Sequence, residues 1–267
     1  MRVRSLHVHP VKATAPIDVT TAEVGLEGLR HDRRWAVVDQ SGHRLNAGHH
    51  DVLMTVRAVP TPDGLELSAP GLAPVRVAEP VGGPRLDVDI SRMPTAVDAG
   101  EAAAAFFTAL LGLPARLVWQ DDPAARSVST AHGGRGDEPL NLADAGPLLL
   151  TTTESLARLN AWIAETGEPA DLSMQRFRPN VVVDGVAEAF AEDAWQTFRI
   201  GTVSFRFAEH CDRCSTTLID PTTLEHGKEP IRTLARHRRW DGRTWFGIRI
   251  VPLTTGTIAL GDAVVTG

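Results

Sequence analysis

The sequence predicts an α+β protein that is rich in β-structure, and three observations along the chain support this. Short β-prone runs separated by turn residues fill the first hundred residues, an alanine-rich helical stretch follows, and strands alternate with helices in the second half. A polar, glycine-containing segment at 121–138 separates the halves, and we predict a mobile loop or lid there. We therefore expect two domains, a β-barrel or sandwich at residues 1–120 and a mixed α+β domain at residues 121–267.

The first half is expected to form short strands because β-branched and apolar residues cluster between turn signals, such as those at 40–43 and 60–64. Strong helix formers fill 100–112 and a glycine ends that stretch, which predicts a helix. The predicted strands of this half cover 3–9, 17–24, 34–39, 53–59, 65–68 and 86–90.

In the second half, a short buried strand at 148–150 is expected to lead directly into a helix. Thr151 and Glu154 fit a capping box at the start of this helix, and Leu156, Leu159 and Ile163 share one of its faces. A second, short helix is predicted over 230–240. The remaining predicted strands cover 180–183, 202–207, 216–219, 246–251 and 257–265.

Composition limits the classes of protein that this chain can be. With 267 residues, 43% of them hydrophobic, the chain can bury a large core. The net charge of −6 argues against a nucleic-acid partner, because a phosphate backbone attracts basic surfaces. The N-terminus has no continuous apolar run, and no stretch approaches the roughly 20 apolar residues of a membrane span, so we expect a cytoplasmic protein without a membrane partner.

The chain has two cysteines, and both lie in Cys211-Asp212-Arg213-Cys214, which we expect in a turn between two strands. A thiolate is a good ligand for transition metals, and Arg213 would favour the thiolate and attract an anion. Three other interpretations stay open at this point. A structural zinc site would need about four ligands, and a thioredoxin-like dithiol would need a helix directly after the motif. The third interpretation is that both cysteines are partly buried and unreactive.

Basic residues at predicted strand ends could gather an anion, since binding groups concentrate at the edges of a rigid β scaffold. Taken singly, each is better explained as a solvated surface charge. Pro179 fixes how its neighbours Arg178 and Asn180 project, although Asn180 could equally satisfy a turn. The basic positions are Lys12, Arg33, Arg178 and Arg213.

Two other sets of residues have a surface interpretation. The histidines at 7, 9, 31, 43, 49 and 50 show no metal-ligand spacing, so we expect most of them to be solvated or paired surface groups. The basic run 236–239 is expected to be a solvated helix face. Its functional alternative is a docking patch for an acidic electron-transfer protein.

Taken together and in order, several motifs resemble the MOSC family with a MOSC N-terminal β-barrel domain, over nearly the whole chain. Within the family, the chain resembles the mitochondrial amidoxime reducing component and its bacterial relatives. The motifs are Pro10-Val11-Lys12, Asp32-Arg33-Arg34-Trp35, Gly100-Glu101-Ala102, Phe177-Arg178-Pro179-Asn180, Ala191-Glu192-Asp193-Ala194-Trp195, Cys211-Asp212-Arg213-Cys214 with Ile219-Asp220-Pro221, and Gly256-Thr257-Ile258-Ala259-Leu260-Gly261-Asp262.

The resemblance implies a barrel-like N-terminal domain packed on a MOSC β-barrel domain with peripheral helices, and a molybdenum–molybdopterin cofactor in the cleft between them. It implies that Cys214 ligates molybdenum, that Asp144 lies near the metal with a catalytic role, and that Thr152 lies in the same wall. Pyridoxal phosphate binding is also associated with the family. Positions implied to bind the cofactor are Lys12, Arg33, Thr152, Arg178, Asn180 and Arg213.

This chain departs from the family pattern at two places. Ala13 stands where serine is usual after Pro-Val-Lys, and Asn46-Ala47-Gly48 stands where Thr-Ala-Arg is frequent. The resemblance implies reduction of N-hydroxylated compounds such as amidoximes, with electrons from a separate ferredoxin-like or cytochrome-like protein and its reductase. The alternatives are a cofactor carrier or sulfur-transfer accessory protein without turnover, and a non-catalytic binding module.

Overall fold

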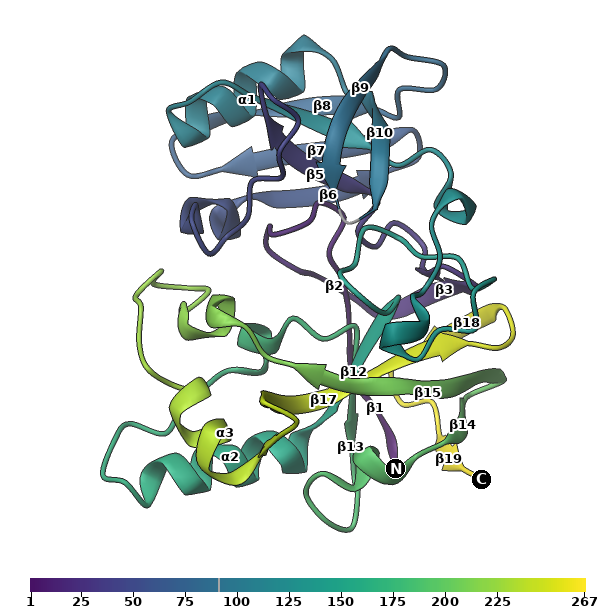
Figure 1. The fold of residues 1–267 in the computed structure, drawn as a ribbon, viewed down its shortest axis with the longest axis vertical. Helices are drawn as coiled ribbons and strands as arrows, with labels where there is room; N and C mark the ends of the chain where they lie inside the picture. The colour runs from purple at the N-terminus through teal and green to yellow at the C-terminus, as the bar shows by residue number, and fades with distance from the viewer. Residues whose placement is uncertain (91) are drawn as a thin grey trace.

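The computed structural model describes residues 1–90 and 92–267 and shows two lobes, one above the other in Figure 1. Both chain termini lie at the far end of the lower lobe, where the Val264 amide donates to the Met1 carbonyl oxygen at 3.1 Å. The described residues are rich in strands and contain three α-helices, which confirms the predicted β-rich α+β class. None of these helices is both long and apolar enough to cross a membrane.

A nine-stranded sheet forms the framework of the lower lobe. Its strands are β1 (Arg2–Val8), β2 (Ile17–Val19), β12 (Leu148–Thr152), β13 (Val181–Asp184), β14 (Thr197–Ile200), β15 (Val203–Asp212), β16 (Arg239–Trp240), β17 (Arg243–Pro252) and β19 (Val264–Thr266). They follow the order β19-β14-β15-β17-β12-β13-β1-β2, with β16 paired to β17. The parallel pair β12 and β13 lies in the middle and is buried, as its runs of leucine and valine require.

Two sheets and one helix build the upper lobe. One sheet contains β5 (Trp35–Asp39), β11 (Ala115–Trp119), β10 (Met93–Asp98) and β9 (Arg85–Ile90), and the other contains β6 (Arg57–Thr61), β7 (Gly64–Ala69) and β8 (Leu72–Ala78). Helix α1 (Glu101–Leu111) buries Phe106 and Phe107 in the core between them and ends at Gly112, whose φ of 67° favours glycine. The predicted helix at 100–112 is confirmed.

A small sheet ties the ends of the chain together. It consists of β18 (Gly256–Ala259), β3 (Thr21–Gly25) and β4 (Gly28–Leu29). Because β1 pairs with β13 and β3 pairs with β18, the first strands of the chain belong to sheets that its last third completes. The division of the chain at residue 120 stays a prediction.

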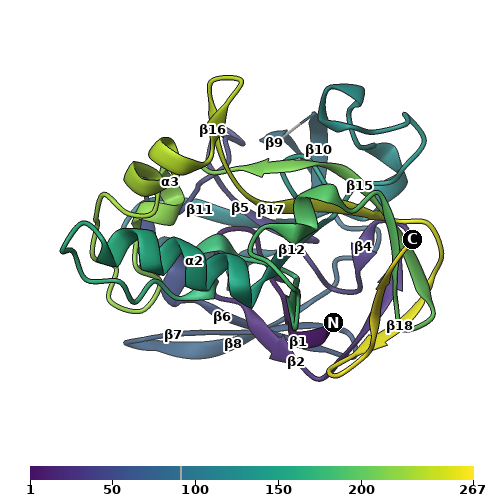
Figure 2. The same ribbon diagram turned by 90° about the horizontal axis from the view of Figure 1, so that it is seen from below.

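Two helices cover one side of the lower lobe (Figure 2), and their starting points correct the predictions. Helix α2 (Thr153–Ala164) is capped by Thr152, whose hydroxyl accepts from the Ser155 amide at 3.2 Å, so the capping box predicted from Thr151 is wrong by one residue. Helix α3 (Ile231–His237) is shorter than the predicted 230–240, because β16 pairs with β17 directly after it.

Other predicted elements differ from the structure for physical reasons. The predicted strand 53–59 begins as the 3-10 helix η1 (Asp51–Thr55), and the predicted strand 216–219 is the 3-10 helix η6 (Ser215–Leu218). Strand β8 was not predicted, since it is an edge strand that contains Pro74. The unpredicted strands are β4, β8, β10, β11, β14 and β16.

The segment 121–138 is not the mobile lid that its polarity predicted. It forms the 3-10 helices η2 (Pro123–Ala125) and η3 (Thr130–His132), and it buries Val128 and the charged Arg126 side chain. Arg206 of β15 holds Glu138, donating from Nε to Oε1 at 2.7 Å. Arg126 and Glu138 of the segment therefore contact the rest of the protein and are not solvated side chains of a free loop.

Candidate functional site

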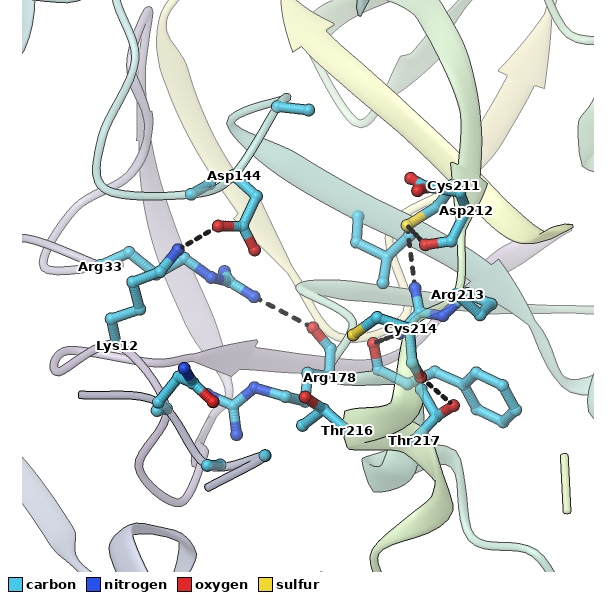
Figure 3. A pocket seen from close by; sticks show the side chains of 18 of the residues that line it. Lys12, Arg33, Asp144, Arg178, Cys211, Asp212, Arg213, Cys214, Thr216 and Thr217 are labelled. Atoms are coloured by element: carbon cyan, nitrogen blue, oxygen red, sulfur yellow. Dashed lines mark hydrogen bonds and ion pairs between the residues drawn. The ribbon is translucent and has the colours of Figure 1, made fainter. Parts of the chain in front are cut away.

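A cavity of about 380 Å³ lies between the lobes, lined by residues from 12–49 on one side and 143–249 on the other (Figure 3). Its lining includes two groups of side chains. We call Lys12, Arg33 and Arg44 the N-terminal wall, and Arg178, Arg213 and Cys214 the thiol wall. The cavity therefore brings together residues that are far apart in sequence, as the strand-end argument predicted for four of these six.

The two cysteines have separate environments. Strand β15 continues to Asp212, so Cys211 lies inside the strand and is buried, whereas Cys214 is exposed and directly precedes η6. The Cys214 thiol points into the cavity, while the Cys211 sulfur accepts from Nη1 of Arg213 at 2.9 Å (Figure 3). The motif was predicted to lie between two strands, but a 3-10 helix follows it in place of the second strand. The thiol presented to a ligand is that of Cys214.

The two arginines of the thiol wall are held by neutral groups. Besides the Cys211 sulfur, Arg213 donates from Nη2 to the Phe177 carbonyl oxygen at 2.8 Å and lies 5.4 Å from the centre of the Phe177 ring. Its Nε is buried and has no partner among the described residues. Arg178 donates to the Thr14 carbonyl oxygen at 2.7 Å, and burial and the nearby charge of Arg33 lower its pKa to about 9.

The cations of the N-terminal wall are paired with carboxylates. Lys12, which follows β1, donates from Nζ to Asp144 at 2.8 Å, and Arg44 donates to the same carboxylate oxygen at 2.8 Å. Arg33 binds the fully buried Asp32 at 2.5 Å. Burial lowers the pKa of Lys12 to about 8, although Asp144 opposes the shift. Desolvation raises the pKa of Asp144, but Lys12 and Arg44 outweigh it and hold that pKa below its usual range.

A buried amide and a buried histidine lie at and next to the cavity. Asn180 donates to the His7 carbonyl oxygen at 3.2 Å and accepts from Arg33 at 3.1 Å. His9 is fully buried, with Nε2 3.2 Å from the Pro179 carbonyl oxygen and no partner for Nδ1 among the described residues. The expectation of a surface histidine is therefore wrong for His9, which lies directly behind the Arg178-Pro179 turn.

Three non-glycine residues of the cavity lining have left-handed backbone conformations. The φ angles are 74° at Ala13, 49° at Arg33 and 55° at Arg178. Such angles cost free energy and persist at sites where the surrounding structure imposes them, which is frequent at functional sites. The two places where the sequence departs from the family pattern, Ala13 and Gly48, both line the cavity.

The structure does not bring Thr152 to the cavity. Its hydroxyl caps α2 and donates to Glu192 at 3.1 Å, in a buried cluster where burial raises the pKa of that carboxyl. The cavity is also lined by three arginines that the sequence did not single out, namely Arg44, Arg176 and Arg249. Arg176 binds Asp220, and Arg249 binds Asp212. No sequence signal separates them or Arg44 from the other arginines in a chain that has only two lysines.

Comparisons with known proteins show the family. The family model of the MOSC N-terminal beta barrel domain matches residues 1–114, and that of the MOSC domain matches residues 137–265. Human mitochondrial amidoxime-reducing component 1 is 30% identical over 98% of this chain and 82% of its own length. This chain belongs to the MOSC family.

Other relatives of this MOSC protein have two kinds of name. Rat mitochondrial amidoxime reducing component 2 is 29% identical over 98% of the chain and 82% of its own length. Zebrafish (Danio rerio) molybdenum cofactor sulfurase is 30% identical over 91% of the chain, but the chain spans only 31% of that protein. The MOSC relatives thus include proteins named for a reduction and a protein named for sulfur transfer.

Proposed function

We propose that this protein is a molybdenum-cofactor-dependent reductase of N-hydroxylated compounds such as amidoximes and hydroxylamines. The observation that carries the proposal is the exposed Cys214 thiol on the wall of a cavity that one lysine and six arginines line. A thiolate is a soft ligand that suits a transition metal, and arginine side chains match the geometry of phosphate. The names of the relatives that match nearly the whole chain support the choice of substrate class.

The residues present fit a metal-bearing group with a phosphate tail. Arg178 and Arg213 have neutral partners, so their charges are left for an anion, and Nε of Arg213 is a buried donor without a partner in the part of the chain that the structure describes. A buried donor without a partner is costly unless a ligand supplies the acceptor. In the proposal Cys214 holds the metal, Lys12, Arg33, Arg178 and Arg213 hold the phosphate, and Asn180 fixes Arg33.

Removing oxygen from an N-hydroxyl group consumes two electrons and two protons and releases water. When bound, the cofactor would supply the metal centre that passes the two electrons. Asp144 is held as a carboxylate by Lys12 and Arg44, so it accepts a hydrogen bond from the substrate and orients it. Nζ of Lys12, with a pKa of about 8, is mostly charged at neutral pH, as holding the phosphate requires.

The replacement Cys214→Ser tests the proposal, with Cys211→Ser as the matched control. Because Cys214 is exposed, its replacement should leave the fold intact. We expect Cys214→Ser to lose bound molybdenum and benzamidoxime reduction by a chemical reductant. Cys211→Ser should keep both, because a serine hydroxyl can accept the hydrogen bond from Arg213. Full activity of Cys214→Ser would sink the assignment.

The name of the sulfurase relative favours one alternative, a cofactor carrier or sulfur-transfer protein that uses the same thiol. That protein would bind molybdenum at Cys214 but would not reduce benzamidoxime with any reductant. Turnover therefore separates the two functions, whereas metal content does not. Pyridoxal phosphate binding and a cytoplasmic location stay predictions.

A further inference from the structure

Helix α3 and the β16–β17 hairpin lie next to each other (Figure 2), and exposed basic side chains lie at the end of the helix and on the hairpin. We define the basic face by four exposed side chains, Arg236, His237, Arg239 and Arg243. It contrasts with the chain as a whole, which carries a net charge of −6. The sequence left open whether this region is a solvated helix face or a docking patch.

Most carboxylates around the basic face are already matched with other cations. Asp193 binds Arg238 at 2.5 Å and lies 3.6 Å from His210. Asp212 and Glu229 each bind another arginine at 2.6 Å, Arg249 and Arg232 respectively. The exposed Asp241, at the turn of the hairpin, is the exception. The face therefore keeps a positive local charge that a partner of opposite charge would complement.

A row of aromatic rings connects the basic face to the cavity. The exposed ring of His237 stacks on Trp162 with centroids 4.2 Å apart, and Trp162 stacks on Phe190 at 5.5 Å. Phe190 meets Phe246 edge to face at 6.3 Å, and Phe246 stacks on Phe177 at 4.0 Å. Phe177 lines the cavity beneath Arg213.

Helix α3 also lies close to Cys214 through a neighbouring element. It contacts η6, and η6 begins at Ser215, directly after Cys214. A cavity of about 380 Å³ admits a small substrate and excludes a protein. An electron-carrier protein must therefore deliver electrons through a packed wall, and the aromatic row crosses the wall between α3 and the cavity.

We propose that the basic face is the docking surface for an acidic one-electron carrier protein that reduces the site at Cys214. This inference rests on the proposed function and adds the place and charge of the partner. Two carriers each lose one electron, and these two electrons with two protons convert the N–OH group to N–H and water. Such redox encounters are small and weak, and opposite charges mainly speed association.

The test replaces Arg236 and Arg239 with glutamate in the holoprotein. The control Arg57→Glu/Arg199→Glu makes the same change of net charge at exposed positions on β6 and β14. The electron donors are an acidic [2Fe–2S] ferredoxin and an acidic flavodoxin, with reduced methyl viologen as a small donor. We expect the Arg236/Arg239 variant to slow carrier oxidation about tenfold or more at low ionic strength, and to keep its rate with viologen. The control should stay within about twofold of the unchanged protein.

Binding of the oxidised carriers, measured without turnover, gives a second readout. Loss of that binding in the Arg236/Arg239 variant and not in the control supports the inference. Equal slowing in both variants, an unaffected Arg236/Arg239 variant, or carrier binding to the unchanged protein that is absent or independent of salt would each overturn it. If viologen supports no turnover in the unchanged protein, the proposed function fails, and carrier binding alone decides the docking surface.

Discussion

The two walls of the cavity hold their cations in different ways. In the N-terminal wall, Lys12 and Arg44 share Asp144, and Arg33 binds Asp32. In the thiol wall, Arg178 and Arg213 donate to carbonyl oxygens and to a sulfur. The first wall is largely neutralised by the protein itself, whereas the second keeps its positive charge beside Cys214. The anion that completes the site should therefore depend most on the thiol wall.

The pKa of Arg178 supports this difference. Burial and Arg33 lower it to about 9, which means that the folded protein destabilises the charged form of Arg178. A bound phosphate would reverse that cost, because an opposite charge nearby favours the charged form of a base. The predictions below test the comparison, beginning with the largest effect.

Replacing Arg178 with methionine should give the largest loss of anion binding, because Arg178 forms no ion pair with a carboxylate among the described residues and donates to a carbonyl oxygen instead. A hydrogen bond to a charged group contributes about 1.5–3 kcal/mol, so we expect affinity for inorganic phosphate to fall at least about tenfold. Arg176→Met is the matched control, since Arg176 also lines the cavity but is paired with Asp220 at 2.8 Å. Calorimetric titration of cofactor-free protein measures both, and equal losses would contradict the distinction between the walls.

Replacing Asp144 with asparagine should instead strengthen anion binding. The change frees the charges of Lys12 and Arg44, and we expect a gain of about three- to tenfold in phosphate affinity at pH 6.5. The gain should shrink by pH 8.5, because without Asp144 the pKa of Lys12 falls below its present value of about 8. Glu66→Gln, which frees Arg76 far along the chain, is the control. Weaker binding in Asp144→Asn would mean that Asp144 positions the cations.

The sequence could predict the thiol and four of the cavity's cations, because strand ends and turns of a β scaffold place side chains in a shared cleft. It could not predict the pairing of Lys12 with Asp144, which joins residues 132 positions apart. Nor could it assign Cys211, whose function as acceptor for Arg213 depends on β15 continuing to Asp212. Thr152 illustrates the opposite error. The family resemblance placed its hydroxyl in the cavity wall. The hydroxyl instead caps the start of α2, because the first backbone amides of a helix need acceptors.

The smallest effect concerns His9, which is buried behind the Arg178-Pro179 turn and near Arg33. Its pKa lies well below the usual 6.5, because of burial first and then the charges of Arg33 and Arg178. Below pH 6.5 His9 is protonated in the unfolded chain but stays neutral in the folded protein until a lower pH. The free energy of unfolding should therefore fall as the pH is lowered, with a slope of up to about 1.4 kcal/mol per pH unit from this group.

Urea unfolding of His9→Gln, followed by tryptophan fluorescence between pH 5 and 7, isolates this contribution. Glutamine can donate to the Pro179 carbonyl oxygen as His9 Nε2 does, but it does not titrate. The stability difference between the unchanged protein and the variant should therefore shift in favour of the variant as the pH falls. His43→Gln, at an exposed position, is the control substitution. A parallel pH dependence in His9→Gln and the unchanged protein would mean that folding does not change proton binding at His9, and that burial and the charges of Arg33 and Arg178 do not lower its pKa.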